Sequence, residues 1–243
     1  MRLIRRKIGG LRASVGTALL LAALAGCSLL TQKNAETVST VGGYGASPAA
    51  APPTVTDPRS LGRGDAPIVI IEYSDYQCPF CGQFHVNVLP SLQREYIDTG
   101  KVRLIFRDLP LDMHRESVPA AIVAHCAGEQ GKFWAMNEAL FANQRELGAA
   151  LYEQLAHDLK LDTDKFNACA RSPLTRKKVQ AGVQEAKRYD MNGTPSFILG
   201  RSVQGKIEIH RTARGLVNFE TFAREIDALL AITPSLEDAA IAG

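Results

Sequence analysis

A short apolar run that is followed at once by two closely spaced cysteines constrains this chain more than any other feature. Residues 68–73 read Ile-Val-Ile-Ile-Glu-Tyr between turn residues, which is typical of a strand that is covered on both faces. The motif Cys78-Pro79-Phe80-Cys81 comes next, and apolar residues at helical spacing continue from it as far as Tyr96. The sequence therefore predicts a dithiol at the first turn of a helix that follows a buried strand.

The region after the dithiol reads as a helix and a second strand. Phe84, Val88 and Leu92 recur at helical spacing, and Pro90 should kink this helix because it cannot donate a backbone hydrogen bond. Residues 101–107 alternate apolar and polar side chains, which predicts a strand. A strand, a helix and a strand within so short a stretch indicate a parallel pair of strands joined by a crossover.

The remainder of the chain changes character twice. From Ser117 to Asp190 the patterns are helical, and no strand is expected. Two strands and a final amphipathic helix follow, at residues 196–199, 206–210 and 219–230. This order predicts an α/β domain in which a set of helices is inserted between the second strand and the third.

The position of Cys78 at the start of a helix gives its sulfur a specific chemistry. Unpaired N–H groups and the helix dipole favour an anion there, so the pKa of the thiol should fall below the free value of about 8.5. A stabilised thiolate both attacks disulfides and leaves mixed disulfides readily. Cys81 would resolve the mixed disulfide, and Pro79 suits a first helical turn because its missing N–H is not needed there.

The N-terminus has the order of an export signal. Its first 26 residues carry five basic side chains and no acid, and the apolar run from Val15 to Ala25 is too short to span a bilayer. The run ends in Leu24-Ala25-Gly26-Cys27, which resembles the lipobox of bacterial lipoproteins. Cleavage before Cys27 and acylation of its sulfur would anchor the protein to a membrane. A buried core helix and an ordinary signal peptide with a cysteine near its cleavage site are the alternatives.

Charge and histidine spacing exclude other classes of site. Removing the five basic residues of the signal from the formal net charge of +3 leaves −2, and no basic run with aromatic residues occurs downstream. Nucleic acid is therefore not an expected partner. The five histidines form no His-x-x-x-His pair and there is no second Cys-x-x-Cys, so no metal site is expected. His85, four residues after Cys81, is interpreted as a surface or packing residue.

The composition divides the chain into parts. Residues 1–26 are the predicted signal peptide, and residues 27–58 are rich in Ala, Pro, Gly and Thr, which predicts a disordered tether. The folded domain is placed at residues 59–233, with its helical insert at about 112–188, and residues 234–243 form a C-terminal tail.

Three stretches together resemble the DsbA-like branch of the thioredoxin superfamily. They are Glu72-Tyr73-Ser74-Asp75-Tyr76-Gln77 with the dithiol that follows, Gln130-Gly131-Lys132-Phe133-Trp134, and Gly193-Thr194-Pro195. The resemblance implies a thioredoxin fold with an inserted helical domain. It also implies a thiol-disulfide oxidoreductase that acts on exported polypeptides in the cell envelope and faces the periplasm or extracytoplasmic space. Such an enzyme needs no bound cofactor and is regenerated by a membrane redox partner.

The resemblance also assigns roles to residues outside the dithiol. Pro195 matches the family's cis-proline opposite the dithiol, and Thr194 would offer its backbone to an extended substrate chain; an ordinary trans turn is the alternative. Glu72 matches a buried acid that could accept the proton of Cys81, whereas a solvated carboxylate at a strand end is the alternative.

The remaining cysteines sort into one lipid site and one further pair. If Cys27 is lipidated, an even number remains, and Cys126 and Cys169 lie on separate predicted helices of the insert. Some relatives carry cysteines at similar places, so a structural disulfide is expected there. Two buried free thiols are the alternative.

The direction of electron flow is left open by the sequence. Pro79 and Phe80 between the two cysteines do not indicate an extreme reduction potential, so oxidase, isomerase and reductase all fit, with oxidase favoured by the resemblance. A non-catalytic lipoprotein that binds peptides or a metal on a thioredoxin scaffold is the alternative from another class of function.

Overall fold

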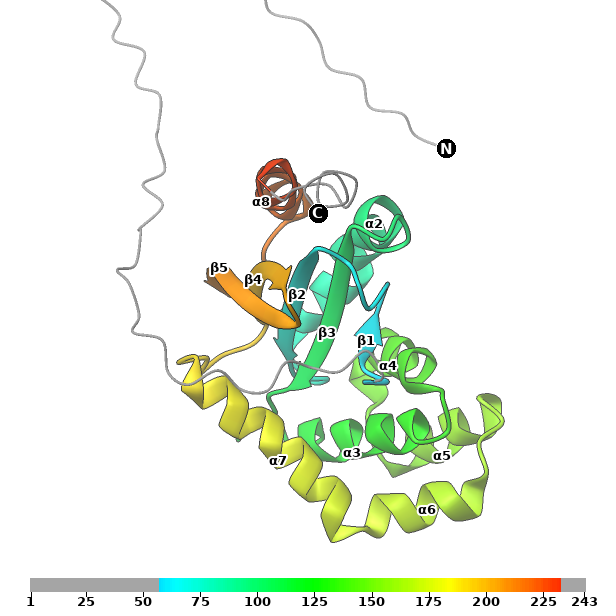
Figure 1. Ribbon diagram of the computed structural model, residues 1–243. Coiled ribbons are helices and arrows are strands. Elements are labelled where there is room, and N and C mark those ends of the chain that lie inside the picture. The colour runs from blue at the N-terminus through cyan, green and yellow to red at the C-terminus, as the bar shows by residue number, and fades with distance from the viewer. Residues whose placement is uncertain (1–56, 233–243) are drawn as a thin grey trace, which may run out of the picture. The chain divides into compact units, whose positions relative to one another are not determined.

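Five strands form one mixed sheet. The structure is a computed structural model that describes residues 57–232 of the 243-residue chain. The strands lie in the order β1-β3-β2-β4-β5 (Figure 1). Their bounds are β1 (Ser60–Leu61), β2 (Ile68–Ser74), β3 (Val102–Asp108), β4 (Ser196–Val203) and β5 (Lys206–Arg214). β2 and β3 are parallel, as the sequence predicts, whereas β4 runs antiparallel to both β2 and β5.

The segment between β2 and β3 is helical but irregular. Its parts are α1 (Pro79–Gln83), η1 (Phe84–Val88), α2 (Leu89–Leu92) and η2 (Gln93–Ile97). The parts η1 and η2 are π-helical turns, which are wider than α-helical ones. Pro90 lies in the first turn of α2 and lacks the N–H that a regular helix would use. The break predicted at Pro90 is thus accommodated by wider turns on either side of it.

Helices fill the chain between β3 and β4. They are α3 (Ser117–Gly128), α4 (Phe133–Ala142), η3 (Gln144–Glu146), α5 (Ala149–Asp158), α6 (Thr163–Arg171) and α7 (Pro173–Arg188). In Figure 1, α3, α5 and α6 lie beyond one end of the sheet and α7 leads back toward it. The last helix, α8 (Phe219–Ala231), follows β5. This arrangement confirms the predicted α/β fold with an inserted set of helices.

The two faces of the sheet pack against different helices. On one face, Ile70 and Phe197 belong to a cluster that includes Phe84 of η1 and residues of α8. On the other face, Ile71 packs in a cluster with Ala186 of α7. Both β2 and β3 are buried along their whole length, as the continuous apolar run of β2 predicts. A third cluster fills the insert and includes both thiols of the dithiol, which therefore lie where the insert meets the sheet.

Polar contacts also fasten the insert to the sheet. The indole Nε1 of Trp134, on α4, donates to the Ser60 carbonyl of β1 at 3.1 Å. At the far end of β3, Arg107 lies 3.0 Å from Asp57 and 3.2 Å from Glu185 of α7, measured between side-chain N and O atoms. The insert is therefore held by directional bonds as well as by apolar packing.

Candidate active site

Cys78 ends the loop that leaves β2, and it is the N-cap residue of α1. Its N–H donates to the Asp75 carbonyl at 3.0 Å. The Asp75 carboxylate is buried and accepts from the N–H groups of Gln77 and Leu111, at 2.8 Å and 2.9 Å. Pro79 follows at the first helical position, where a missing N–H costs nothing. These bonds fix the loop so that Cys78 stands at the open end of the helix.

The two thiols of the dithiol differ in their access to solvent. Cys78 and Cys81 are both free cysteines in the structure. Cys78 keeps 4% of its surface exposed, whereas Cys81 has none. A reacting partner can therefore meet Cys78 first, and Cys81 can react only from inside.

The two thiols also differ in acidity. A hydrogen bond from the Cys81 thiol, joined by the backbone N–H groups of Cys81 and Phe80, lowers the pKa of Cys78 to about 5 in spite of its burial. Burial has the opposite effect on Cys81: it raises the pKa of that thiol far above its usual range, and the bond to Cys78 and the charge of Glu72 add to the rise. At neutral pH the pair therefore holds one thiolate, on Cys78, and one thiol, on Cys81.

Glu72 lies beneath the dithiol on β2 and is fully buried. Its Oε1 lies 3.0 Å from Nε2 of His85, whose side chain is 5% exposed. The His85 ring stacks on Phe141 of α4, with ring centroids 3.8 Å apart. Among residues 57–232, Glu72 Oε2 has no hydrogen-bond partner. One carboxylate oxygen is thus held in place by His85, and the other is left without a partner in this part of the chain.

The loop before β4 supplies the opposite wall. The Cys78 Sγ lies 3.3 Å from the Thr194 carbonyl oxygen, and the Thr194–Pro195 peptide bond is cis. The Pro195 carbonyl accepts from the N–H of Gly215 at 2.8 Å, and the Ser196 hydroxyl donates to the Gly193 carbonyl at 2.6 Å. The structure therefore places Thr194 and Pro195 beside the dithiol, although the whole insert separates them from it in the sequence.

Two residues at the site were not anticipated from the sequence. The packing alternative for His85 is confirmed by its stacking on Phe141, but its bond to Glu72 was not predicted. Its spacing of four from Cys81 places both on one helical face, which was the available signal. Gln144 of η3 donates to the carbonyls of Tyr76 and Cys78. It lies in an irregular stretch of the insert, where no sequence pattern marks it.

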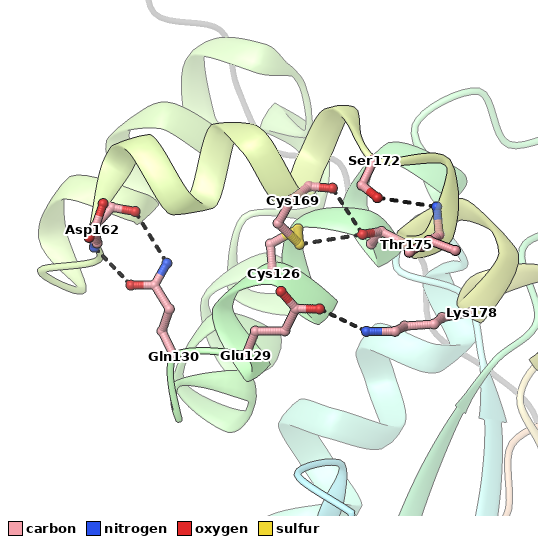
Figure 2. Close-up of a disulfide and its surroundings, with 9 residues drawn as sticks. Cys126, Glu129, Gln130, Asp162, Cys169, Ser172, Thr175 and Lys178 are labelled. Atoms are coloured by element: carbon pink, nitrogen blue, oxygen red, sulfur yellow. Dashed lines mark hydrogen bonds and ion pairs between the residues drawn. A yellow bond between two sulfur atoms is a disulfide. The ribbon is translucent and has the colours of Figure 1, made fainter.

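The second pair of cysteines lies within the insert. Cys126 of α3 and Cys169 of α6 form a disulfide with an S–S distance of 2.07 Å (Figure 2). The Thr175 hydroxyl donates to the Cys169 carbonyl at 2.9 Å. Nearby, Lys178 of α7 pairs with Glu129 at 2.7 Å, as Figure 2 shows. The disulfide thus belongs to the contacts that hold α3, α6 and α7 together.

The other predicted features fall outside the described part of the chain. Cys27, the signal peptide, nearly all of the tether and the tail lie before residue 57 or after residue 232. Within residues 57–232, no helix combines the length and the apolar character needed to cross a membrane. In the same part of the chain, His, Cys, Asp and Glu side chains form no group of three that could hold a metal ion.

Several known proteins are similar to this chain in sequence. A protein-family model described as thioredoxin matches residues 54–218. "Probable disulfide bond formation protein D" of Bacillus cereus is 31% identical over 150 residues, which are 57% of this chain and 68% of that protein. "Na(+)/H(+) antiporter NhaA 3" of Salinispora tropica is 33% identical over 165 residues, which are 67% of this chain. The chain spans only 25% of that antiporter's length.

Solved structures share the fold. The alpha-DsbA1 protein of Wolbachia pipientis is 30% identical, with a TM-score of 0.66 over 74% of this chain and 93% of that one. BdbD of Bacillus subtilis, in an oxidised crystal structure, is 21% identical, with a TM-score of 0.63 over 74% of this chain and 97% of that one. At that lower identity the likeness to BdbD concerns the fold alone.

Proposed function

Because the chain belongs to the DsbA-like branch of the thioredoxin family, we propose that it is a thiol-disulfide oxidoreductase whose reacting pair is Cys78 and Cys81. Its substrates are cysteine thiols of exported polypeptides in the bacterial cell envelope. The favoured direction is oxidation of these thiols to disulfides. No bound cofactor is needed, since every electron moves between sulfur atoms.

The unequal acidity of the two thiols is the observation that carries the oxidase direction. The pKa of Cys78 is lowered to about 5, so the reduced protein holds a stabilised thiolate at neutral pH. A dithiol that is stabilised in its reduced form corresponds to a disulfide that is a strong oxidant. The same low pKa makes Cys78 the better leaving group from a mixed disulfide, which favours release of an oxidised substrate.

The forward reaction begins from a Cys78–Cys81 disulfide. A substrate thiolate attacks Cys78 Sγ, a substrate–Cys78 bond forms, and Cys81 leaves as a thiolate that takes up a proton because its pKa is high. A second substrate thiolate then attacks the substrate sulfur and expels Cys78 as the stabilised thiolate. The substrate has lost two electrons, and these remain on the Cys78–Cys81 dithiol.

Regeneration uses the disulfide of a membrane redox partner. The Cys78 thiolate attacks that disulfide and expels one partner thiolate. Cys81 then loses its proton, attacks Cys78 Sγ and expels the second partner thiolate, so the partner leaves as a dithiol. Glu72 is the proposed proton acceptor for Cys81, which is supported by its burial and by the unpartnered Oε2 beneath the dithiol.

Substrate docking is assigned to Thr194 and Pro195. The Thr194 carbonyl lies 3.3 Å from Cys78 Sγ, so a chain that extends along this loop would bring its own sulfur to the reacting atom. Proline has no N–H, and backbone groups beside it can pair with a polypeptide of any sequence. This supports a substrate range set by exposed thiols more than by side-chain identity.

The place of the enzyme in the cell is proposed from its N-terminus. The basic and apolar segment that ends in Leu24-Ala25-Gly26-Cys27 supports export and acylation of Cys27, with the tether at residues 27–58 between the lipid and the domain. The enzyme would then face the periplasm or extracytoplasmic space. Mass spectrometry of the mature N-terminus should find an acylated Cys27, and an unmodified terminus elsewhere would contradict the anchor.

Replacement of Cys81 by Ala tests the reaction itself. The variant keeps the attacking Cys78 but cannot resolve a mixed disulfide, so it should accumulate covalent complexes with exported proteins that dithiothreitol releases. The additional replacement Cys78→Ala should remove them. A protein that only binds peptides or a metal would yield no such complexes and would keep its affinity.

The reduction potential of the Cys78–Cys81 couple tests the direction. If the protein is an oxidase, its reduction potential should lie near the oxidising end of the range for redox-active protein dithiols, at about −120 mV. A value near about −270 mV would favour a reductase. Equilibration with glutathione buffers and mass spectrometry of the alkylated protein would measure it. A reducing value would overturn the oxidase assignment and leave the exchange chemistry in place.

A further inference from the structure

The side-chain amide of Gln144 reaches from the insert to the backbone of the dithiol loop. Its Nε2 donates to the carbonyl oxygens of Tyr76, at 2.7 Å, and Cys78, at 2.9 Å. Carbonyl oxygens can only accept, so the amide nitrogen must face both of them and the amide oxygen must point away. One side chain thus bridges the residues on either side of Gln77, directly before α1.

The amide oxygen of Gln144 lies against Gly82, the residue after Cys81. A β-carbon on Gly82 would overlap this oxygen, so the glycine leaves the space that the amide occupies. The Gly82 N–H also donates to the Cys78 carbonyl, at 3.1 Å. This carbonyl therefore holds one donor from its own helix and one from the insert, which uses both of its lone pairs.

The end of α4, from which Gln144 projects, also contacts Tyr76 of the dithiol loop. Asn137 Nδ2 of α4 donates to the Tyr76 hydroxyl at 3.0 Å. The rings of Phe141 and Tyr76 have centroids 4.8 Å apart. After the helix ends, Asn143 Nδ2 donates back to a carbonyl of its last turn at 2.8 Å. The residue that follows, Gln144, therefore projects from a helix end that is fixed against the same loop.

We infer that Gln144 is a positioning residue for thiol-disulfide exchange: it holds the Tyr76 and Cys78 carbonyls so that the first turn of α1 stays directed at the Cys78 sulfur. The inference rests on the proposed function and names a residue that serves it. The N–H groups of Phe80 and Cys81 stabilise the Cys78 thiolate only while the turn that carries them keeps its orientation. Without the amide, both carbonyls lose a donor and the turn gains freedom.

Gln144→Met is the direct test, because methionine keeps the side-chain length but cannot donate. The pKa of Cys78, followed by the ultraviolet absorbance of its thiolate, should rise by about 0.5 to 1 unit, as expected for loss of a neutral hydrogen-bond pair. The equilibrium constant with glutathione should shift about three- to tenfold toward a weaker oxidant, which is about 15 to 30 mV for a two-electron couple.

Gln130→Met is the matched control. The Gln130 amide also bridges backbone groups of the insert, since it donates to the Asp162 carbonyl at 3.2 Å and accepts from the Asp162 N–H at 2.8 Å (Figure 2). Its contacts lie between helices of the insert and not on the dithiol loop. The pKa of Cys78 and the glutathione equilibrium should therefore stay at the wild-type values in this variant.

Gly82→Ala tests the same contact from the other side. The new methyl group would displace the flexible end of Gln144, so this variant alone should reproduce the shift of Gln144→Ala. In the double variant Gly82→Ala/Gln144→Ala, the two shifts should not add, because a single contact is lost only once. This cycle also protects the test if Gln144→Met folds poorly.

Additive shifts in the cycle, or a Gln144→Met protein that matches Gln130→Met, would overturn the positioning role. Such a result with an active wild type leaves the proposed function standing. A wild-type protein without exchange activity would overturn the proposed function itself, whatever the variants do.

Discussion

Cys78 stands before the first turn of one helix, whereas Cys126 and Cys169 lie in the last turns of two others, α3 and α6. Burial does not separate the two pairs, because Cys81 and Cys126 are both fully buried. The helix ends do. The partial positive charge of an N-terminus stabilises a thiolate, and the partial negative charge of a C-terminus opposes one. The first pair is therefore suited to exchange, and the second is suited to stay closed.

The two pairs also constrain the chain differently. Cys78 and Cys81 are one helical turn apart, so a bond between them closes a very short loop. Cys126 and Cys169 are 43 positions apart, and their disulfide joins two separate helices, α3 and α6. Cross-linking over a longer loop removes more freedom from the unfolded chain. Function is thus expected from the first pair and stability from the second.

The largest expected effect separates the pairs by activity. Cys78→Ala should abolish oxidation of a reduced, unfolded disulfide protein, with a loss of at least about a hundredfold, because the Cys78–Cys81 disulfide that accepts the substrate's electrons cannot form without Cys78. The double variant Cys126→Ala/Cys169→Ala should keep activity within about threefold of the wild type at a temperature where it is folded. Equal losses in both would show that the second pair takes part in exchange.

The second expected effect concerns stability, for which the Cys126–Cys169 pair should matter more than the dithiol. Removing the Cys126–Cys169 disulfide should lower the free energy of unfolding by up to about 4 kcal/mol, measured by denaturant titration. The double variant Cys78→Ala/Cys81→Ala loses only a disulfide that closes a very short loop. Its free energy of unfolding should therefore differ far less from that of the oxidised wild type. A larger loss from the dithiol variant would contradict the division of roles.

The third prediction concerns pH and applies only to the reduced dithiol. Folded Cys78 keeps its proton only below about pH 5, whereas the thiol of an unfolded chain keeps it up to about pH 8.5. The unfolded state therefore binds more protons between these values, and the free energy of unfolding should rise with pH across them, by at most about 1.4 kcal/mol per pH unit. The contribution is complete above the unfolded pKa and is lost as pH falls through the folded one.

Denaturant titrations of the reduced protein between about pH 5 and pH 8 would measure this slope. Cys78→Ala, measured alongside, supplies the slope of all other groups. The raised pKa of Cys81 acts in the opposite sense, but only at pH values above its unfolded pKa. A wild type whose slope equals that of Cys78→Ala would show that the Cys78 thiolate is not stabilised.

The smallest expected effect concerns the proton of Cys81. Glu72→Gln keeps the shape of the side chain but accepts no proton, so resolution of a mixed disulfide by Cys81 should slow by about tenfold at neutral pH. Stopped-flow reoxidation of the reduced protein would measure this rate. Glu185→Gln is the control, because Glu185 accepts from the Tyr73 hydroxyl at 3.1 Å, and the Tyr73 side chain packs on the opposite face of β2 from Glu72. Equal rates in the two variants would remove Glu72 from the reaction.

Much of the fold could be predicted because local sequence patterns determine it. The buried strand β2 is a continuous apolar run, and the order of strands and helices follows from periodicity and turn residues. The strand β1 was not expected, since Ser60–Leu61 is too short to carry a period. The indole N–H of Trp134, a residue that also packs against the core of the insert, reaches out to β1. Such a contact depends on tertiary packing that a local pattern does not encode.

The site could be predicted only in part for the same reason. The dithiol and its place at a helix start are local features, and the sequence located them. The environment of Glu72 depends on His85 of η1 and on Phe141 of α4 in the insert, both distant from it in the sequence. Gln144 is a polar residue after a helix end, and nothing near it in the sequence indicates that it reaches Cys78.

The chain that separates Cys78 from Thr194 has a consequence for biogenesis. The two residues are neighbours in the structure although they are 116 positions apart in the sequence, with the helices α3 to α7 in that interval. A polypeptide that crosses a membrane from its N-terminus would deliver Cys78 long before the loop that faces it. On the proposed export route, the emerging cysteine would have neither the proposed docking loop nor the insert beside it until the last strands had been released. Catalytic competence would then arise late in secretion, after the polypeptide has been delivered almost in full.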